Sequence, residues 1–145
     1  MRTGDVMTRE VELVTPEASL EAVAIKMKDS GVGLIPVCEN DRLIGVITDR
    51  DITVRATAKG RAPQQARVRE VMTPQVLYCF EDQSLAEAAN RMEQKAVRRL
   101  IVLNRQKRLV GIISIDDLAA VPGKEALVGE VLDHVAEPRP LQPKQ

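Results

Sequence analysis

The apolar residues in the first half of this chain follow two spacings, one typical of helices and one typical of strands. Over residues 20–27 they recur every three or four positions, which predicts an amphipathic helix with one buried face. Ser19 precedes this stretch, and a serine side chain can accept a hydrogen bond from the first turn of a helix. A short apolar run at residues 11–14 comes before the helix and predicts an opening strand.

Two strands and a second helix are predicted next. Residues 34–38 and 43–48 are apolar runs, and the polar residues 39–42 between them predict the turn that joins two strands. A helix is then predicted to begin near Asp49 and to end near Gly60, because glycine commonly terminates helices. The predicted order of the first half is therefore strand, helix, strand, strand, helix.

The same order of elements occurs again in the second half of the chain. Residues 43–51 have the sequence LIGVITDRD and residues 109–117 have LVGIISIDD, and Gly45 recurs as Gly111, 66 residues later. Such a regular duplication predicts two similar units that pack together, with any site at their junction present twice. Other matches fall 65 residues apart: Met7-Thr8 with Met72-Thr73, Ser19-Leu20 with Ser84-Leu85, and Met27 with Met92. The second copy predicts strands at 76–80, 99–103 and 108–114, a helix after Ser84, and a helix from about Ile115 to Pro122-Gly123.

The duplication divides the chain at residue 66. Residues 1–66 form the first repeat with the polar linker that follows it, and residues 67–122 form the second repeat. Residues 123–137 carry apolar side chains at helical spacing and predict an amphipathic C-terminal helix. Residues 138–145 contain three prolines among polar residues, so we expect this tail to be disordered.

Composition and charge narrow the class of protein. Trp is absent and the aromatic residues are Tyr78 and Phe80, so the core has to be aliphatic, which suits a mixed α/β fold. The formal net charge is +0 and neither half carries a basic excess, which argues against nucleic acid as a partner. No apolar run is long enough to span a bilayer and no signal-peptide pattern occurs, so we expect a cytoplasmic protein without a membrane partner.

Each copy contains a hydroxyl residue and, three positions later, an aspartate. These residues are Thr48 and Asp51 in the first copy and Ser114 and Asp117 in the second. A helix that begins here has unpaired N–H groups which can receive a phosphate, and the aspartate can accept both hydroxyls of a ribose. The same residues can equally form a capping box, in which hydroxyl and carboxylate satisfy the helix start without any ligand. Local sequence leaves both interpretations open.

Order, spacing and both heptads together resemble the cystathionine-β-synthase (CBS) domain over about residues 4–121. The heptads are Gly45-Val46-Ile47-Thr48-Asp49-Arg50-Asp51 and Gly111-Ile112-Ile113-Ser114-Ile115-Asp116-Asp117. The resemblance implies an α/β (α+β) fold: a tandem pair of CBS repeats, each β-α-β-β-α, packed in pseudo-two-fold symmetry. The chain is similar to the small bacterial CBS pairs that stand alone, with no catalytic domain attached. The resemblance further implies a homodimer in which the helical faces of two copies meet.

The resemblance also implies two nucleotide-binding clefts, each built from both repeats. Arg98 lies where the family often has a basic phosphate contact, although it can equally be a surface charge or an ion-pair partner. Arg50 and Arg55 add positive charge to the first cleft and Asp116 adds a carboxylate to the second, so we expect the first to prefer ligands with more phosphate. The first cleft would place Thr48, Arg50 and Asp51 against Thr73, Leu77 and Val97. The second would place Ser114, Asp116 and Asp117 against Thr8, Glu12 and Val32.

The function implied by this resemblance is regulatory. The clefts would bind an adenine nucleotide, either AMP, ADP or ATP or an S-adenosylmethionine-like ligand, and the module would signal to a downstream partner protein that the sequence does not identify. The alternative is a protein–protein interaction module whose clefts are vestigial. We do not expect an enzyme, a metal site or a cofactor other than this ligand, because no Ser-His-acid set, metal cluster or Gly-rich phosphate loop is apparent.

Three remaining side chains carry chemistry of their own. Cys38 and Cys79 can form a redox-sensing pair or can be two buried, reduced thiols, and the second interpretation is the one favoured for cysteines at strand positions. His134 is the sole histidine, and we expect it at the surface near the end of the C-terminal helix.

Overall fold

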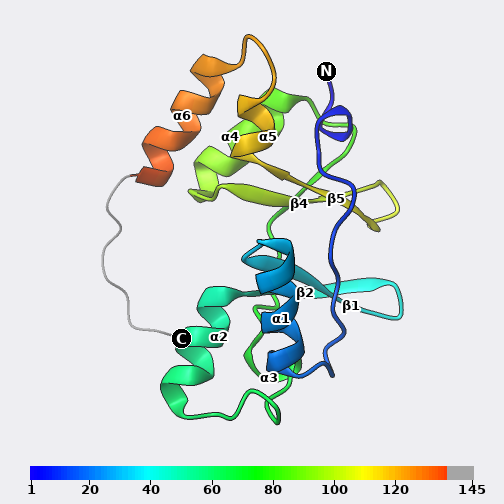
Figure 1. Cartoon of the computed structure of the whole chain (residues 1–145). Helices are drawn as coiled ribbons and strands as arrows, with labels where there is room; N and C mark the ends of the chain where they lie inside the picture. The colour runs from blue at the N-terminus through cyan, green and yellow to red at the C-terminus, as the bar shows by residue number, and fades with distance from the viewer. Residues whose placement is uncertain (137–145) are drawn as a thin grey trace.

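The computed structural model describes residues 1–136 and has the mixed α/β fold predicted from the sequence. Two halves lie one above the other in Figure 1, each with a small sheet and helices packed beside it. The first half contains α1 (Leu20–Ser30), β1 (Leu34–Glu39), β2 (Arg42–Thr48), α2 (Asp49–Arg55), the 3-10 turn η2 (Thr57–Lys59) and α3 (Val68–Val71). The second contains β3 (Tyr78–Phe80), α4 (Leu85–Lys95), β4 (Arg99–Leu103), β5 (Leu109–Ser114), α5 (Ile115–Ala119) and α6 (Glu125–Ala136).

Side-chain caps begin the long helices where the sequence predicts them. Ser19 before α1 and Ser84 before α4 each accept, at 3.1 Å, a hydrogen bond from the backbone N–H three residues later. The second helix of the first half is shorter than predicted, because α2 ends at Arg55. The turn η2 then carries the chain to Gly60, whose left-handed φ of 71° ends the helical stretch.

An antiparallel hairpin lies at the centre of each half. β1 pairs with β2, and β4 pairs with β5, in equivalent registers that place Val37 opposite Gly45 and Val102 opposite Gly111. The second sheet has a third strand, because β3 runs parallel to β4. The second half therefore has the full β-α-β-β-α order.

The prediction of a strand at residues 11–14 is wrong, because only a single bridge between Val14 and Val37 forms there. In the second half, Ile101 donates its backbone N–H to the carbonyl of Leu77 at 3.2 Å, just before β3. Pro36 occupies the equivalent place in the first half, and proline has no N–H to donate. The first half consequently lacks this hydrogen bond, and its opening segment is held to the sheet by the bonds of Val14 to Pro36 and Cys38, at 3.2 and 3.0 Å.

The segments that open the two repeats are exchanged between the halves. Residues 2–8 include the 3-10 turn η1 (Thr3–Asp5), and they cross to the second half, where Thr8 and Ile112 exchange backbone hydrogen bonds of 2.8 and 3.0 Å. Residues 66–73 cross to the first half, where Thr73 and Val46 exchange bonds of 2.8 and 2.9 Å. In Figure 1 the N-terminus accordingly lies beside the β4–β5 half, and α3 lies beside α1.

This exchange gives each core side chains from both repeats. Met7 is 7% exposed and packs in the core of the second half, against α4, β4 and β5. Val68 and Val71, at 0% and 1% exposure, pack in the core of the first half against α1 and the β1–β2 hairpin. The predicted division at residue 66 separates the two repeats along the sequence. Each core, however, also contains residues from the other side of that division.

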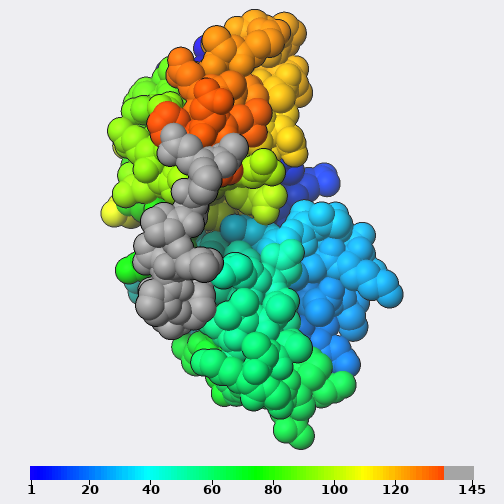
Figure 2. Space-filling model, turned by 90° about the vertical axis from the view of Figure 1, so that its left-hand side faces the viewer, coloured from blue at the N-terminus to red at the C-terminus, as the bar shows by residue number. Residues whose placement is uncertain are grey.

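The predicted C-terminal helix is α6, and it covers the helical side of the second half. It contacts α4 and α5, and Val131 on its inner face is 0% exposed. Figure 2 shows α6, in orange to red, on the surface of the second repeat. Residue 137 and the tail predicted at 138–145 lie outside the described residues.

Candidate functional site

The glycine of each heptad allows the crossing segment to approach its sheet. A Cβ atom at Gly45 would lie 2.6 Å from the carbonyl oxygen of Thr73, and one at Gly111 would lie 2.7 Å from that of Thr8. These are the carbonyls that accept hydrogen bonds from β2 and β5, so any side chain at either glycine would displace the pairing. The heptad glycine thus places Thr73 and Thr8 beside the start of the following helix.

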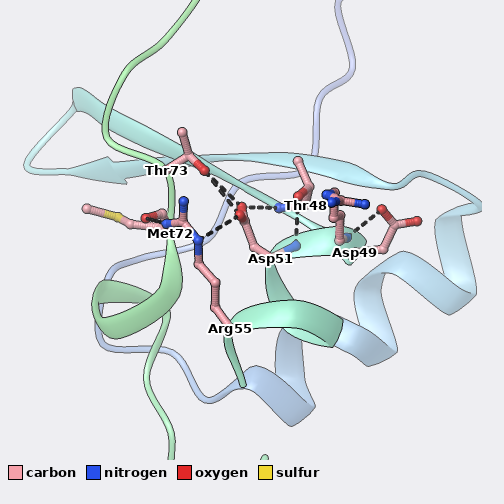
Figure 3. Close-up of polar contacts among 7 residues, drawn as sticks. Thr48, Asp49, Asp51, Arg55, Met72 and Thr73 are labelled. Atoms are coloured by element: carbon pink, nitrogen blue, oxygen red, sulfur yellow. Dashed lines mark hydrogen bonds and ion pairs between the residues drawn. The ribbon is translucent and has the colours of Figure 1, made fainter. Parts of the chain in front are cut away.

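Asp51 is the centre of the first candidate cluster (Figure 3). Its carboxylate accepts the backbone N–H of Thr48 at 3.0 Å, and Thr48 Oγ1 accepts the N–H of Asp51 at 3.0 Å, which completes a capping box. Thr73 donates its hydroxyl to the two Asp51 oxygens at 3.1 and 3.2 Å. Arg55 Nε lies 3.8 Å from Asp51 Oδ1, and the aspartate is 7% exposed. Its hydrogen-bonding capacity is therefore largely used within the protein.

Asp117 is the centre of the second cluster and has fewer partners. It forms the same capping box with Ser114, with distances of 2.9 and 3.2 Å. Thr8 Oγ1 lies 3.4 Å from Asp117 Oδ1, a weaker hydrogen bond than those of Thr73 to Asp51. Asp117 is half-buried rather than buried. Because a carboxylate has about four acceptor positions, the capping box leaves Asp117 able to bind further donors.

A capping box, one of the two arrangements that the sequence allows, thus forms at both positions. The helices that follow are short, with 7 residues in α2 and 5 in α5, so neither supplies a strong dipole for an anion. Any ligand contact at these positions has to come from the side chains and from the crossing segments.

The Asp117 cleft is a cavity of about 540 Å³ that brings together the residues expected for the second cleft. Val11 and Leu34 from the first repeat and Ile112 from β5 add apolar surface to it. Its volume and mixed lining are those of a typical small-molecule site. The expected residues that line it are Thr8, Glu12, Val32, Ser114, Asp116 and Asp117.

The Thr73 cleft is a second cavity, of about 470 Å³, and it contains part of the set expected for the first cleft. The expected lining residues are Thr73, Leu77, Val97 and Arg98. The expected α2 residues do not line it: Asp51 and Arg55 pair with each other and with the segment at Met72 and Thr73, and Arg50 is exposed. The positive charge of this cavity comes from Arg98 and Arg99 instead.

Sequence reasoning missed three residues that line both cavities, Leu34, Arg99 and Ile112. Leu34 and Arg99 are 65 residues apart, and each begins the strand after the first helix of its repeat, so they are equivalent positions of the duplication. The duplication could therefore have predicted that Leu34 and Arg99 occupy equivalent places. Their shared exposure to both cavities, however, depends on how the two hairpins pack against each other.

The two cysteines are free and poorly ionised. Burial raises the pKa of the Cys79 thiol to about 11, although the charge of Arg91 opposes the shift. Cys38 is half-buried, and burial together with the nearby Asp41 raises its pKa as well. High pKa values leave few thiolates at neutral pH, so the geometry favours inert thiols over a redox pair.

His134 lies at the surface of α6, as expected. Its Nδ1 is 3.0 Å from the carbonyl oxygen of Glu130, and its Nε2 is 3.4 Å from the carboxylate of Glu93. Within residues 1–136, no group of three or more His, Cys, Asp and Glu side chains could hold a metal ion. Among the helices of the same residues, none is long and apolar enough to cross a membrane.

Comparison with known proteins identifies the family. The sequence pattern of the CBS domain matches residues 4–56 and 68–123. The CBS domain-containing protein YhcV of Bacillus subtilis is 38% identical over 132 residues, which cover 91% of this chain and 93% of YhcV. Hypoxic response protein 1 of Mycobacterium tuberculosis is 35% identical over 125 residues, 86% of this chain and 87% of that protein.

Solved structures show the same fold. The structure of hypoxic response protein I, which contains two coordinated zinc ions, matches with a TM-score of 0.74 and 35% identity over 84% of this chain and 100% of that one. The CBS domain pair of protein MJ0100, in complex with 5′-methylthioadenosine and S-adenosyl-L-methionine, matches with a TM-score of 0.71 over 82% of this chain and 97% of that one. At 22% identity, that second likeness concerns the fold alone. Residues 4–56 and 68–123 of this chain are therefore two CBS domains, and the chain belongs to the CBS domain family.

Proposed function

We propose that this CBS pair is a regulatory module that binds an adenosine-containing ligand in the clefts between its repeats and signals to a partner protein. The observation that carries the proposal is the Asp117 cleft, where a half-exposed carboxylate lies in a cavity of about 540 Å³ lined by both repeats. The MJ0100 pair, with the same fold, has been solved with two adenosine ligands, and this supports the choice of ligand class.

The lining of the Asp117 cleft suits the parts of an adenosine. Asp117 retains acceptor capacity for the two hydroxyls of a ribose, and the hydroxyls of Thr8 and Ser114 lie beside it. Val32, Leu34 and other apolar side chains of the same cavity offer surfaces for a purine ring. AMP, ADP, ATP and S-adenosylmethionine all share this adenosine, so they form the first set of ligands to test.

Signalling would follow from the position of the cleft between the repeats. A ligand there touches the crossing segment at Thr8 and the start of α5 at the same time. It would therefore favour the relative position of the repeats in which both contacts form, and a partner protein that distinguishes those positions would respond to it. In this role the module is regulatory rather than catalytic.

Isothermal titration calorimetry on aspartate variants tests the proposal. Asp117→Ala is expected to weaken binding in the Asp117 cleft by about 1–3 kcal/mol, because a charged acceptor for the ribose hydroxyls is lost. Asp51→Ala is expected to weaken binding in the Thr73 cleft by a similar amount, through the loss of the position of Thr73. In wild type, ligand at a hundred times its Kd should stabilise the fold by about 2.7 kcal/mol.

Glu87→Ala is the matched control. Glu87 completes the capping box of Ser84 at the start of α4, at 3.1 and 3.2 Å, but it lines neither cleft. This variant should therefore destabilise a helix start without changing ligand affinity. Unchanged affinity in the Asp51, Asp117 double variant, or no binding by wild type to any ligand of the set, would refute the proposed function.

The alternative function, a protein–protein interaction module with vestigial clefts, is favoured by Asp51. Its carboxylate is 7% exposed and is already bonded to Thr48 and Thr73 and paired with Arg55, as a purely structural residue would be. Under this alternative, no adenosine ligand raises the melting temperature of the wild-type protein.

A further inference from the structure

Arg99 is a charged residue shared by the two clefts. It is the first residue of β4, directly across the strand pair from Ser114, and it lines both the Asp117 cleft and the Thr73 cleft. Its equivalent in the first repeat, Leu34, also lines both and lies opposite Thr48. Pseudo-symmetry thus places Leu34 and Arg99 at equivalent positions between the cavities, where Ile112 of β5 also lines both, and Arg99 is the charged residue among the three.

The remaining charges of the two clefts have opposite signs. The Thr73 cleft has Arg98 beside Arg99, and no acidic residue from the described part of the chain lines it. In the Asp117 cleft, Arg99 is the one basic lining residue within 1–136, and Glu12 is already paired with Lys26 at 3.3 Å. The acidic residues of that cleft are Glu10, Glu12, Asp116 and Asp117.

Among the described residues, no side chain holds Arg99 toward either cleft. Its side chain is exposed, and within residues 1–136 it makes no ion pair and no hydrogen bond. An arginine side chain has several rotatable bonds, and its guanidinium binds phosphate and carboxylate groups well. Arg99 can therefore turn toward a phosphate in the Thr73 cleft or toward the carboxylates of the Asp117 cleft.

We propose that Arg99 couples the two clefts according to the charge of their ligands. A phosphorylated ligand in the Thr73 cleft draws Arg99 to its phosphate, which leaves the acidic lining of the Asp117 cleft without a counter-charge. A positively charged adenosine derivative, such as a sulfonium, then binds more tightly in the Asp117 cleft, and a second anionic ligand binds more weakly. The coupling is reciprocal, and it rests on the proposed function.

Calorimetric titration of S-adenosylmethionine, with and without saturating AMP, tests the coupling. At about 50 mM salt, AMP is expected to tighten S-adenosylmethionine binding by roughly fivefold to tenfold, at the lower end of the usual range of coupling between sites. S-adenosylhomocysteine, which lacks the sulfonium charge, should gain little. Raising the salt to about 500 mM should remove most of the effect, because these side chains are exposed to solvent.

Two neighbouring arginines provide the variant and its control. Arg99→Gln is expected to abolish the effect of AMP and to tighten S-adenosylmethionine binding on its own, because the acidic cleft loses its counter-charge. Arg98→Gln should weaken AMP but keep the coupling, because Arg98 lines the Thr73 cleft alone. Melting temperatures of both exposed variants show whether the fold is intact.

The outcomes separate the coupling from the proposed function. If adenosine ligands bind but AMP leaves S-adenosylmethionine affinity unchanged, or if Arg99→Gln couples as wild type does, Arg99 does not link the clefts. If AMP and S-adenosylmethionine compete for one cleft, the assignment of ligand charge to cleft is wrong. If no adenosine ligand binds at all, the proposed function fails, and the coupling fails with it.

Discussion

At the scale of single residues, the heptad glycines Gly45 and Gly111 lie against the backbone of the segments that cross between the repeats. Carbonyl oxygens of Thr73 and Thr8 would be 2.6 and 2.7 Å from an added Cβ atom, which is closer than carbon and oxygen can approach. Each glycine is therefore required by a contact with the other repeat, although the motif that contains it lies within one repeat.

Gly111→Ala is expected to destabilise the protein by about 1–3 kcal/mol, because the new methyl group would push Thr8 away from Ile112. Urea denaturation followed by circular dichroism measures the change. Gly129→Ala is the matched control: Gly129 lies inside α6 with no atom within 4 Å of its added Cβ, so the same change should stabilise the helix by up to about 1 kcal/mol. Equal effects of the two substitutions would contradict the close-approach argument.

At the scale of elements, α6 completes the core of the second repeat. Its buried residue Val131 packs with Met92 of α4 and Leu118 of α5 in one cluster, and each of the three is 0% exposed. The first repeat has no equivalent of α6 among the described residues. The two cores of the protein are thus built from similar repeats, but helices cover them to different extents.

Val131→Ala is expected to lower the free energy of unfolding by about 2 kcal/mol, through lost burial and the cavity that remains. Leu132→Ala, one residue along the same helix and 37% exposed, should change it by less than about 0.5 kcal/mol. Thermal or urea unfolding of the two variants makes the comparison. A similar loss in both would mean that α6 is not anchored through Val131.

The elements that the sequence predicted well are those specified by local signals. Ser19 and the helical spacing after it define α1, and the duplication repeats both signals in α4. The strand at residues 11–14 could not be judged locally, because its pairing depends on a donor that Pro36, in another element, cannot supply. The residues expected from the family resemblance line the Asp117 cleft. The position of Arg99 between the two clefts could not be predicted in this way, because it depends on how the two hairpins pack against each other.

At the scale of the whole molecule, no helix among residues 1–136 covers the helical face of the first repeat as α6 covers that of the second. Ala89 and Met92 of α4 are 1% and 0% exposed, whereas their equivalents Ala24 and Met27 on α1 are exposed and half-buried. Ile25 on α1 is 52% exposed. An exposed apolar surface of this kind favours association with another protein surface.

We expect a homodimer in which the α1 faces of two copies meet, since α6 already occupies the equivalent face of the second repeat. Ile25→Glu should shift the protein toward monomer, because it places a charge in the interface. Leu132→Glu, on α6, should leave the dimer intact. Sedimentation velocity at micromolar concentration makes the measurement, and a monomeric wild type would exclude this assembly.

The exchanged opening segments bear on how a duplicated gene of this kind becomes established. In a single repeat with this packing, the opening segment would not fill its own core, because Met7 packs in the second half and Val68 in the first. Such a half-length ancestor could complete itself by trading that segment with a second copy, as a swapped dimer. Fusion of the two copies makes this exchange of segments intramolecular. The effective concentration of one repeat near the other then no longer depends on expression level. After fusion the two halves are free to diverge, and the presence of leucine at position 34 but arginine at position 99 is a difference that a symmetric dimer of identical halves cannot have.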